Sequence, residues 1–203
     1  MRRALVGLLF FAAALAAPLG PAEAAERVAT AIVFADSAIE QILGDGLAVA
    51  VMQWSDGHKL VVPWTILHAP EDARALAARI AAMPRAPGIS TELSLALLAA
   101  ADLLDACPCA PLTRVIDLSG DGSNNGPIST PIARDEVVAR GIRINGLPIV
   151  TPAEPDVAEW YRLNAVGGDG AFMEVANGYE DFARAMRRKF LLEVAARKGG
   201  RGG

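Results

Sequence analysis

Apolar runs alternate with amphipathic stretches along most of this chain. Residues 47–54 form an apolar, β-branched run, a Ser-Asp-Gly turn signal follows, and residues 59–64 form a second run. This pattern predicts a β-hairpin. Pro63 assigns the second strand to a sheet edge, because proline cannot donate to a hydrogen-bond ladder. Trp54 and Trp64 are expected to be packing residues of this hairpin.

The rest of the chain continues the alternation of helix and strand patterns. A buried strand at 114–118 breaks into a glycine-rich acidic loop at 119–125, with the sequence SGDGSNN. Helices are predicted at 70–82, 90–104, 127–140, 154–162 and 179–197, and further strands at 142–149 and 171–175. Strands alternating with helices predict an α/β fold: a three-layer, doubly wound, mostly parallel sheet with one antiparallel edge strand.

One segment near the start fits two patterns. Residues 28–34 have the composition of a strand. Apolar positions across residues 27–43, however, recur at helical spacing, and Gly44 would end such a helix. We favour the helix.

Both ends of the chain predict segments outside the domain. Residues 1–25 combine two arginines, a short apolar stretch and an alanine-rich cleavage site, which is typical of a secretory signal peptide. A retained membrane anchor is the alternative, but the stretch is short and is interrupted by proline and glycine. We expect an exported, periplasmic or secreted protein without membrane insertion after cleavage. It would have one domain at 26–196 and a disordered tail at 197–203.

Composition and cysteine content narrow the class of protein. Of the 203 residues, 53% are hydrophobic, enough for a sizeable core, and the net charge of −4 argues against nucleic-acid binding. The two cysteines, Cys107 and Cys109, flank one proline. An exported location permits a disulfide, although such a ring is tight. The sequence leaves the redox state of these thiols open.

The loop at 119–125 is the strongest candidate for chemistry. Two interpretations of it are excluded, and a third is disfavoured. A phosphate loop is excluded because Asp121 would lie against the phosphate and the Walker lysine is missing. An EF-hand is excluded because Ile132 stands where a glutamate ligand is needed. A Ser119 nucleophile lacks the G-x-S-x-G turn, and no motif pairs it with His58 or His68, which we expect at the surface.

A site for a hard cation is the fourth interpretation. Asp121 would supply a carboxylate at a strand end, and Thr91 a hydroxyl at the start of the buried helix. The ordinary alternative stays open, in which Ser90 or Thr91 is a helix N-cap and Asp121 a turn residue.

Six segments carry a family resemblance. They are 49–55, 61–64, 88–91, 114–125, 144–149 and 182–189. The chain resembles, over residues 27–195, a group of exported bacterial proteins of unknown function, domain-of-unknown-function family 1194, which are similar to von Willebrand factor A domains. The resemblance implies a doubly wound α/β fold with a metal-ion-dependent adhesion site, at which an acidic residue of a partner protein completes the metal coordination.

Matching that motif residue by residue gives an incomplete metal site. Thr91 and Asp121 correspond to the threonine and the aspartate of the site. The expected loop support is Ser90, Ser119, Gly120, Gly122 and Asn124. The Asp-x-Ser-x-Ser motif has no match, and Asp36 does not replace it. Magnesium or another divalent cation would therefore bind weakly, and residues 28–34 must fill the slot of a lost central strand.

Three hypotheses about function follow. The first is an exported, non-catalytic protein-binding module with a degenerate metal site. The second is a periplasmic hydrolase that uses the loop of Ser119 and Asp121. The third is a decayed relative that folds poorly.

Overall fold

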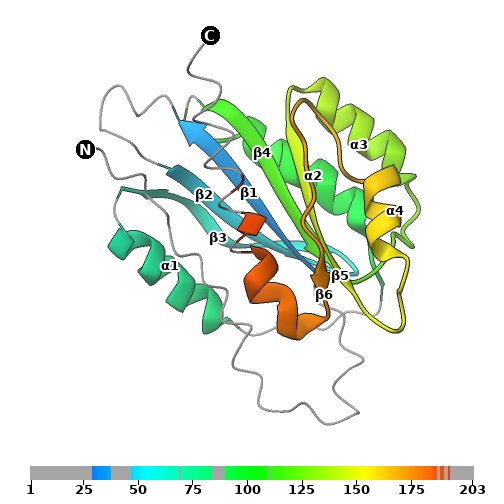
Figure 1. Cartoon of the computed structure of the whole chain (residues 1–203). Helices are drawn as coiled ribbons and strands as arrows, with labels where there is room; N and C mark the ends of the chain where they lie inside the picture. The colour runs from blue at the N-terminus through cyan, green and yellow to red at the C-terminus, as the bar shows by residue number, and fades with distance from the viewer. Residues whose placement is uncertain are drawn as a thin grey trace.

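A six-stranded sheet forms the centre of the molecule (Figure 1). The structure is a computed structural model that describes residues 29–37, 47–68, 70–83, 90–109 and 111–186, with 188, 189 and 192. The strands lie in the order β3-β2-β1-β4-β5-β6. Their bounds are Ala29–Ser37 (β1), Leu47–Trp54 (β2), His58–Leu67 (β3), Pro111–Gly120 (β4), Arg143–Val150 (β5) and Ala176–Asn177 (β6).

Four strands of the sheet share one direction. β4, β5 and β6 pair in parallel, and β2 has the same sense as β4 because both are antiparallel to the strand between them, β1. The edge strand β3 is antiparallel to β2 and contains Pro63, as its predicted edge position requires. The α/β class and the edge strand are thus confirmed, and the sheet contains one further reversed strand in its interior.

The helix favoured at 27–43 is wrong where the structure describes this segment. Residues 29–37 form β1, which fills the central slot between β2 and β4. Residues 30–36 of this strand pair on both sides, so ladder hydrogen bonds with two neighbours replace the intrahelical bonds that the apolar spacing suggested. Tertiary pairing has overridden the local pattern.

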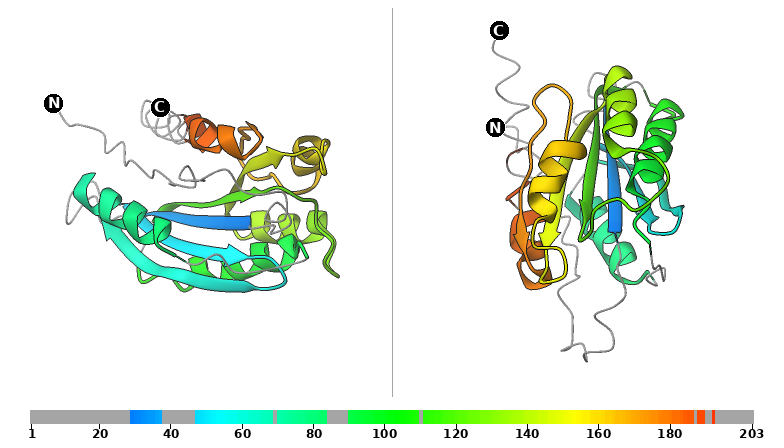
Figure 2. Two further views of the ribbon diagram at one scale, coloured as in Figure 1. Left: turned by 90° about the horizontal axis from the view of Figure 1, so that it is seen from below. Right: turned by 90° about the vertical axis from the view of Figure 1, so that its right-hand side faces the viewer.

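Helices cover both faces of the sheet (Figure 2). They are α1 (Pro70–Ala81), α2 (Leu93–Asp105), α3 (Thr130–Ala139) and α4 (Val157–Asn164), and residues 182–186 and 188–189 are also helical. One core packs α2, α3 and α4 against the sheet through side chains such as Leu97, Val137 and Tyr161. The other packs α1 and the helical residues 182–186 through Leu76 and Met186. The two cores give the three-layer arrangement that the sequence predicts.

Several element boundaries differ from the sequence prediction. The strand predicted at 171–175 is instead a two-residue strand, β6, at Ala176–Asn177. The buried helix begins at Leu93 rather than at Ser90, with Glu92 as its N-cap residue, so neither Ser90 nor Thr91 caps it. The predicted signal peptide at 1–25 and tail at 197–203 lie outside the described residues.

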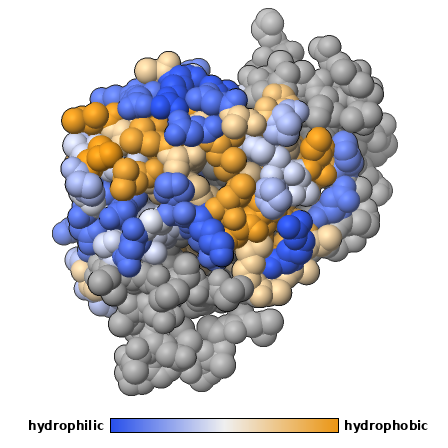
Figure 3. Space-filling model, turned by 180° about the vertical axis from the view of Figure 1, so that it is seen from behind, coloured by the Kyte–Doolittle hydropathy of each residue, from blue (hydrophilic) through white to orange (hydrophobic). Residues whose placement is uncertain are grey.

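The described surface is mixed in polarity. On the side seen from behind, hydrophilic residues are interspersed with smaller apolar groups (Figure 3). The large apolar side chains at the surface include Ile132 and Leu163, which are 66% and 55% exposed. Within the described residues, no helix has the length and apolar composition needed to cross a membrane.

Candidate functional site

Asp121 lies directly after β4, where the strand passes into the glycine-rich loop. Its side chain is 6% exposed, and its Oδ2 accepts a hydrogen bond from the phenol of Tyr179. Tyr179 follows β6 and the turn residue Gly178, whose φ of 89° is in the region that favours glycine. The C-terminal ends of β4 and β6 thus lie at the same edge of the sheet. The hydrogen-bond donor to the Asp121 carboxylate is neutral. No pattern in the sequence pointed to Tyr179, because it lies 58 positions from Asp121.

The loop that contains Thr91 is joined to the Asp121 loop through Asn125. The backbone N–H of Thr91 donates to Oδ1 of Asn125 at 2.6 Å, and the backbone N–H of Asn125 donates to the carbonyl of Thr91 at 3.0 Å. Thr91 is buried, at 4% exposed. Two of the loops that the family resemblance implies for a metal site are therefore held together by reciprocal hydrogen bonds.

Asn124 anchors the same loop to α2 and to the segment before α3. Its Oδ1 accepts the backbone N–H of Ser94 in α2 at 3.3 Å, and its Nδ2 donates to the carbonyl of Ile128 at 3.0 Å. The hydroxyls of Ser94 and Thr130 lie 2.9 Å apart and connect α2 to α3. These contacts fix the path of the loop, and the support of a ligand site by Asn124 stays a prediction.

The remaining predicted support residues have different surroundings. Ser119, Gly120 and Gly122 are buried. Ser90 instead bonds to the β2–β3 turn, where its hydroxyl lies 2.6 Å from Oδ1 of Asp56. Asp56 belongs to the turn signal that predicted the hairpin, but its contact with Ser90 was not predicted.

Tyr161 of α4 is a buried aromatic residue near Asp121. It is fully buried, and its hydroxyl has no hydrogen-bond partner among the described residues. Burial raises the pKa of this phenol, and the negative charge of Asp121 raises it further. Tyr161 therefore stays neutral and cannot act as a base at neutral pH.

The direction of β1 places Asp36 far from Asp121. In the register of β1 with β4, Thr30 lies opposite Ser119, whereas Asp36 lies opposite Thr113. Asp36 is therefore about 25 Å from the end of β4 that carries Asp121, at about 3.3 Å per residue. Reversal of the strand takes its C-terminal end to the far edge of the sheet.

The donors near Asp121 do not fit a strong magnesium site. Thr91 and Asp121 supply one hydroxyl and one carboxylate, and Tyr179 already occupies one carboxylate oxygen. Among the residues that the structure describes, no group of three or more His, Cys, Asp or Glu could hold a metal ion. Magnesium prefers an octahedron of oxygen ligands, of which this edge offers few.

A second aspartate on the same strand forms a buried ion pair that the sequence did not reveal. Asp117 and Lys189 are 4% and 1% exposed, and Nζ of Lys189 donates to Oδ1 of Asp117. Asn145, directly opposite Asp117 on β5, donates to the same oxygen at 3.4 Å. The only signal in the sequence was an acidic residue inside an apolar run.

Phe172 contributes both its backbone and its ring to the surroundings of this pair. The Oδ1 atom of Asn145 accepts the backbone N–H of Phe172 at 3.2 Å, and Nζ of Lys189 lies 5.5 Å from the centroid of the Phe172 ring. Oδ2 of Asp117 has no hydrogen-bond partner in the described part of the chain. One oxygen of a buried carboxylate is thus unsatisfied.

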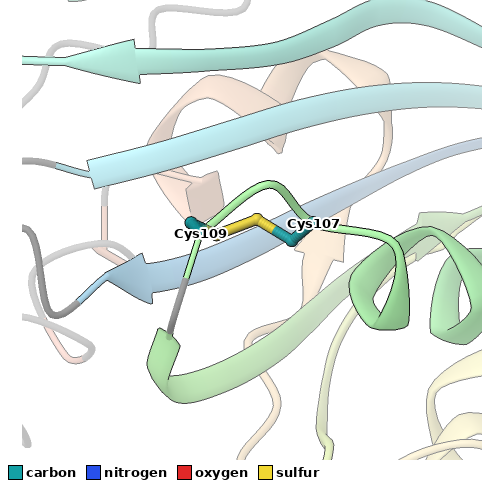
Figure 4. The surroundings of a disulfide bond; sticks show 2 residues. All are labelled: Cys107 and Cys109. Carbon is teal, nitrogen blue, oxygen red and sulfur yellow. A yellow bond between two sulfur atoms is a disulfide. The ribbon is translucent and has the colours of Figure 1, made fainter.

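Cys107 and Cys109 are joined by a disulfide (Figure 4). The pair lies in the loop that leads from α2 to β4, and both residues pack against the core formed by α2, α3 and α4. The state left open by the sequence is therefore the oxidised one. Its position beside a packed core favours a structural role.

The geometry argues against the hydrolase hypothesis. Ser119 is 5% exposed, so its hydroxyl is poorly placed to attack a substrate. His58 and His68 are exposed, as predicted, and His58 lies in the edge strand β3.

Comparison with known proteins agrees with the fold. Residues 22–198 match the family described as "Protein of unknown function (DUF1194)". No curated protein matches the chain. Proximal thread matrix protein 1 from the mussel byssus has a similar structure, with a TM-score of 0.55 and 16% sequence identity. That match covers 71% of this chain and 36% of the mussel chain, and it concerns the fold alone.

Proposed function

Because the chain belongs to the family of proteins of unknown function DUF1194, we propose that it is an exported binding module of the von Willebrand A type. It binds another protein through the edge of the sheet that carries Asp121 and Tyr179. It is non-catalytic, and its metal site is degenerate. Export rests on the signal-like residues 1–25.

The hydrogen bond between Tyr179 and Asp121 is the observation that carries this proposal. In a working adhesion site, a cation would lie against this carboxylate. Here a phenol from the same chain satisfies it, and the main carboxylate of the first motif is absent. These features support recognition without a metal.

The exposed side of Tyr179 supports protein binding at this edge. The residue is 51% exposed although its hydroxyl is bonded to Asp121. Tyrosine is enriched at the centres of protein interfaces because it supplies a large, rigid contact area. A rigid aromatic ring beside the ordered loop at 119–125 suits such a contact.

Metal-independent capture of a partner tests the proposal. The immobilised protein is incubated with periplasmic extract of its own host, with EDTA or with Mg²⁺, and retained proteins are quantified by mass spectrometry. We expect the same partner in both conditions and its loss with Tyr179→Ala. The matched control is Ile66→Ala, which removes an exposed apolar side chain opposite Ala48, at the other end of β2.

A magnesium titration followed by thermal unfolding tests the degenerate site separately. We expect no stabilisation of the wild-type protein by millimolar Mg²⁺, because a ligand stabilises only when its concentration exceeds its dissociation constant. A clear rise in Tm that Asp121→Ala abolishes would restore a working metal site and overturn this part of the proposal. A sharp, cooperative melt would also contradict the hypothesis of a decayed, poorly folding relative.

A further inference from the structure

The buried cluster of Asp117, Asn145 and Lys189 contains the groups needed to form a covalent bond. It joins β4, β5 and the helical residues 188–189 under one face of the sheet. We propose that Lys189 and Asp117 condense to an intramolecular amide, a self-formed cross-link between the C-terminal helix and the sheet. The inference is independent of protein binding at the edge with Asp121.

Burial makes the charged form of this pair unfavourable. Asp117 and Lys189 are both almost completely buried, and one oxygen of the carboxylate has no hydrogen-bond partner among the described residues. An ion pair in the interior recovers its desolvation cost only when its remaining atoms are also satisfied. Proton transfer from the ammonium to the carboxylate removes both charges and leaves a neutral amine next to a carboxylic acid.

The geometry then favours attack by the amine. Nζ of Lys189 is already in contact with Oδ1 of Asp117, and thus lies beside its Cγ atom. Holding two reacting groups together in this way converts a bimolecular reaction into an intramolecular one with a high effective concentration. The neighbouring ring of Phe172, 5.5 Å from Nζ, contributes an apolar wall to the site.

Asn145 is placed to stabilise the charge that develops during the attack. Its Nδ2 donates to Oδ1 of Asp117, the oxygen that becomes negative in the tetrahedral intermediate. The backbone N–H of Phe172 holds the other end of this amide, so that Nδ2 faces Asp117. The arrangement resembles an oxyanion hole with a single donor.

Atoms and protons balance without a co-reactant. The first proton passes from the Lys189 ammonium to the carboxylate oxygen that it contacts. Rotation of the neutral carboxyl group about its Cβ–Cγ bond then brings the protonated oxygen to the Oδ2 position and the carbonyl oxygen to the Oδ1 position beside Asn145. The lone pair of Nζ attacks Cγ and forms the N–C bond, and a second proton passes from Nζ to Oδ2. The Cγ–Oδ2 bond breaks, one water leaves, and Oδ1 becomes the amide carbonyl that accepts from Asn145. The oxygen that leaves occupies the position without a partner in the ion pair.

Peptide mapping of the purified, reduced and alkylated protein tests the proposal. Trypsin would release residues 115–134 and, after cleavage behind Arg188, residues 189–197. We expect one branched peptide that joins these two segments, with a mass lower than their sum by one water molecule. Cleavage after Lys189 should be absent, since its amine is acylated. Detection of the linear peptide 115–134 at its full mass, together with the peptide 190–197, would overturn the proposal.

Two variants serve as matched controls. Lys189→Met should abolish the branched peptide, whereas Lys59→Met, which removes an exposed lysine of β3, should retain it. Asn145→Ala should slow its formation after refolding by about 100-fold or more, the effect of losing one oxyanion donor. Formation at the wild-type rate would refute this role of Asn145. The wild-type digest is decisive by itself, so the conclusion does not depend on the folding of any variant.

Discussion

Asp117 and Asp121 occupy nearly identical depths, but they have different kinds of partner. They are 4% and 6% exposed and are separated by three residues of the same chain segment. Asp117 faces a cation, Lys189, whereas Asp121 accepts from the neutral phenol of Tyr179. The inner carboxylate has its charge balanced within the chain. The outer one lies just after β4 and accepts a hydrogen bond from a neutral donor.

This comparison distinguishes two environments within one chain segment, a cation beside Asp117 and a neutral donor beside Asp121. Burying an unpaired charge is costly, so the cation beside Asp117 supports a structural role for that pair. Burial alone does not distinguish the two aspartates, and the charge of the partner does.

Removing the inner cation should have the largest effect on stability. Lys189→Met leaves a buried, uncompensated carboxylate, and we expect the free energy of unfolding to fall by about 3–5 kcal/mol. Urea unfolding monitored by tryptophan fluorescence measures this loss. A loss below about 1 kcal/mol, the range of an exposed pair, would contradict the structural role of the pair of Asp117 and Lys189.

A double variant distinguishes the ion pair from the cross-link. Asp117→Leu combined with Lys189→Met replaces both charges by apolar groups, which should restore stability if only an ion pair was lost. The proposed amide joins residues 72 positions apart. A deficit of about 4 kcal/mol should therefore persist, by analogy with the loop-closure entropy of a disulfide.

The outer pair should show an intermediate effect. Tyr179→Phe removes one hydrogen bond to a charged, buried acceptor, and we expect a loss of about 1.5–3 kcal/mol in urea unfolding. Tyr161→Phe is the matched control, because its buried hydroxyl has no partner among the described residues. That control should be neutral or slightly stabilising, and a larger loss for Tyr161→Phe than for Tyr179→Phe would contradict this assignment of roles.

Asp181 provides the partly exposed reference and the smallest effect. The guanidinium of Arg184, followed by the backbone N–H of Asn177, lowers the pKa of Asp181 from 3.8 to about 2. A lowered pKa in the folded state stabilises the protein above the pKa of the unfolded chain, and this contribution is lost as the pH falls towards 2. Thermal melts should show a smaller decrease in Tm across this interval for Asp181→Asn than for the wild type. Equal slopes would show that the pair contributes nothing.

Much of the fold could be predicted from local pattern, because local chemistry determines it. The hairpin of β2 and β3 is defined by its turn residues, and the proline in β3 restricts that strand to an edge. The burial of α2 follows from its apolar composition. The identity of β1 depends on ladder partners contributed by β2 and β4, which no window around residues 29–37 contains.

The candidate site was predictable only in part, for a similar reason. Asp121 and Asn124 stand in a glycine-rich loop after a buried strand, so their position at a sheet edge followed from the sequence. Tyr179 and Lys189 reach their aspartates from 58 and 72 residues away. Contacts of that separation arise from topology and leave no periodic signal.

The reversal of β1 also has a consequence for the order of folding. β1, β2 and β3 follow one another in the chain and pair as antiparallel neighbours, so they form a meander of sequence-local contacts. A parallel β1 would instead need a long crossover before its first pairing. Local hairpins form in about 1–10 μs. We expect the meander to assemble early and β4 to add to the open edge of β1, which makes this half of the sheet a template for the other half.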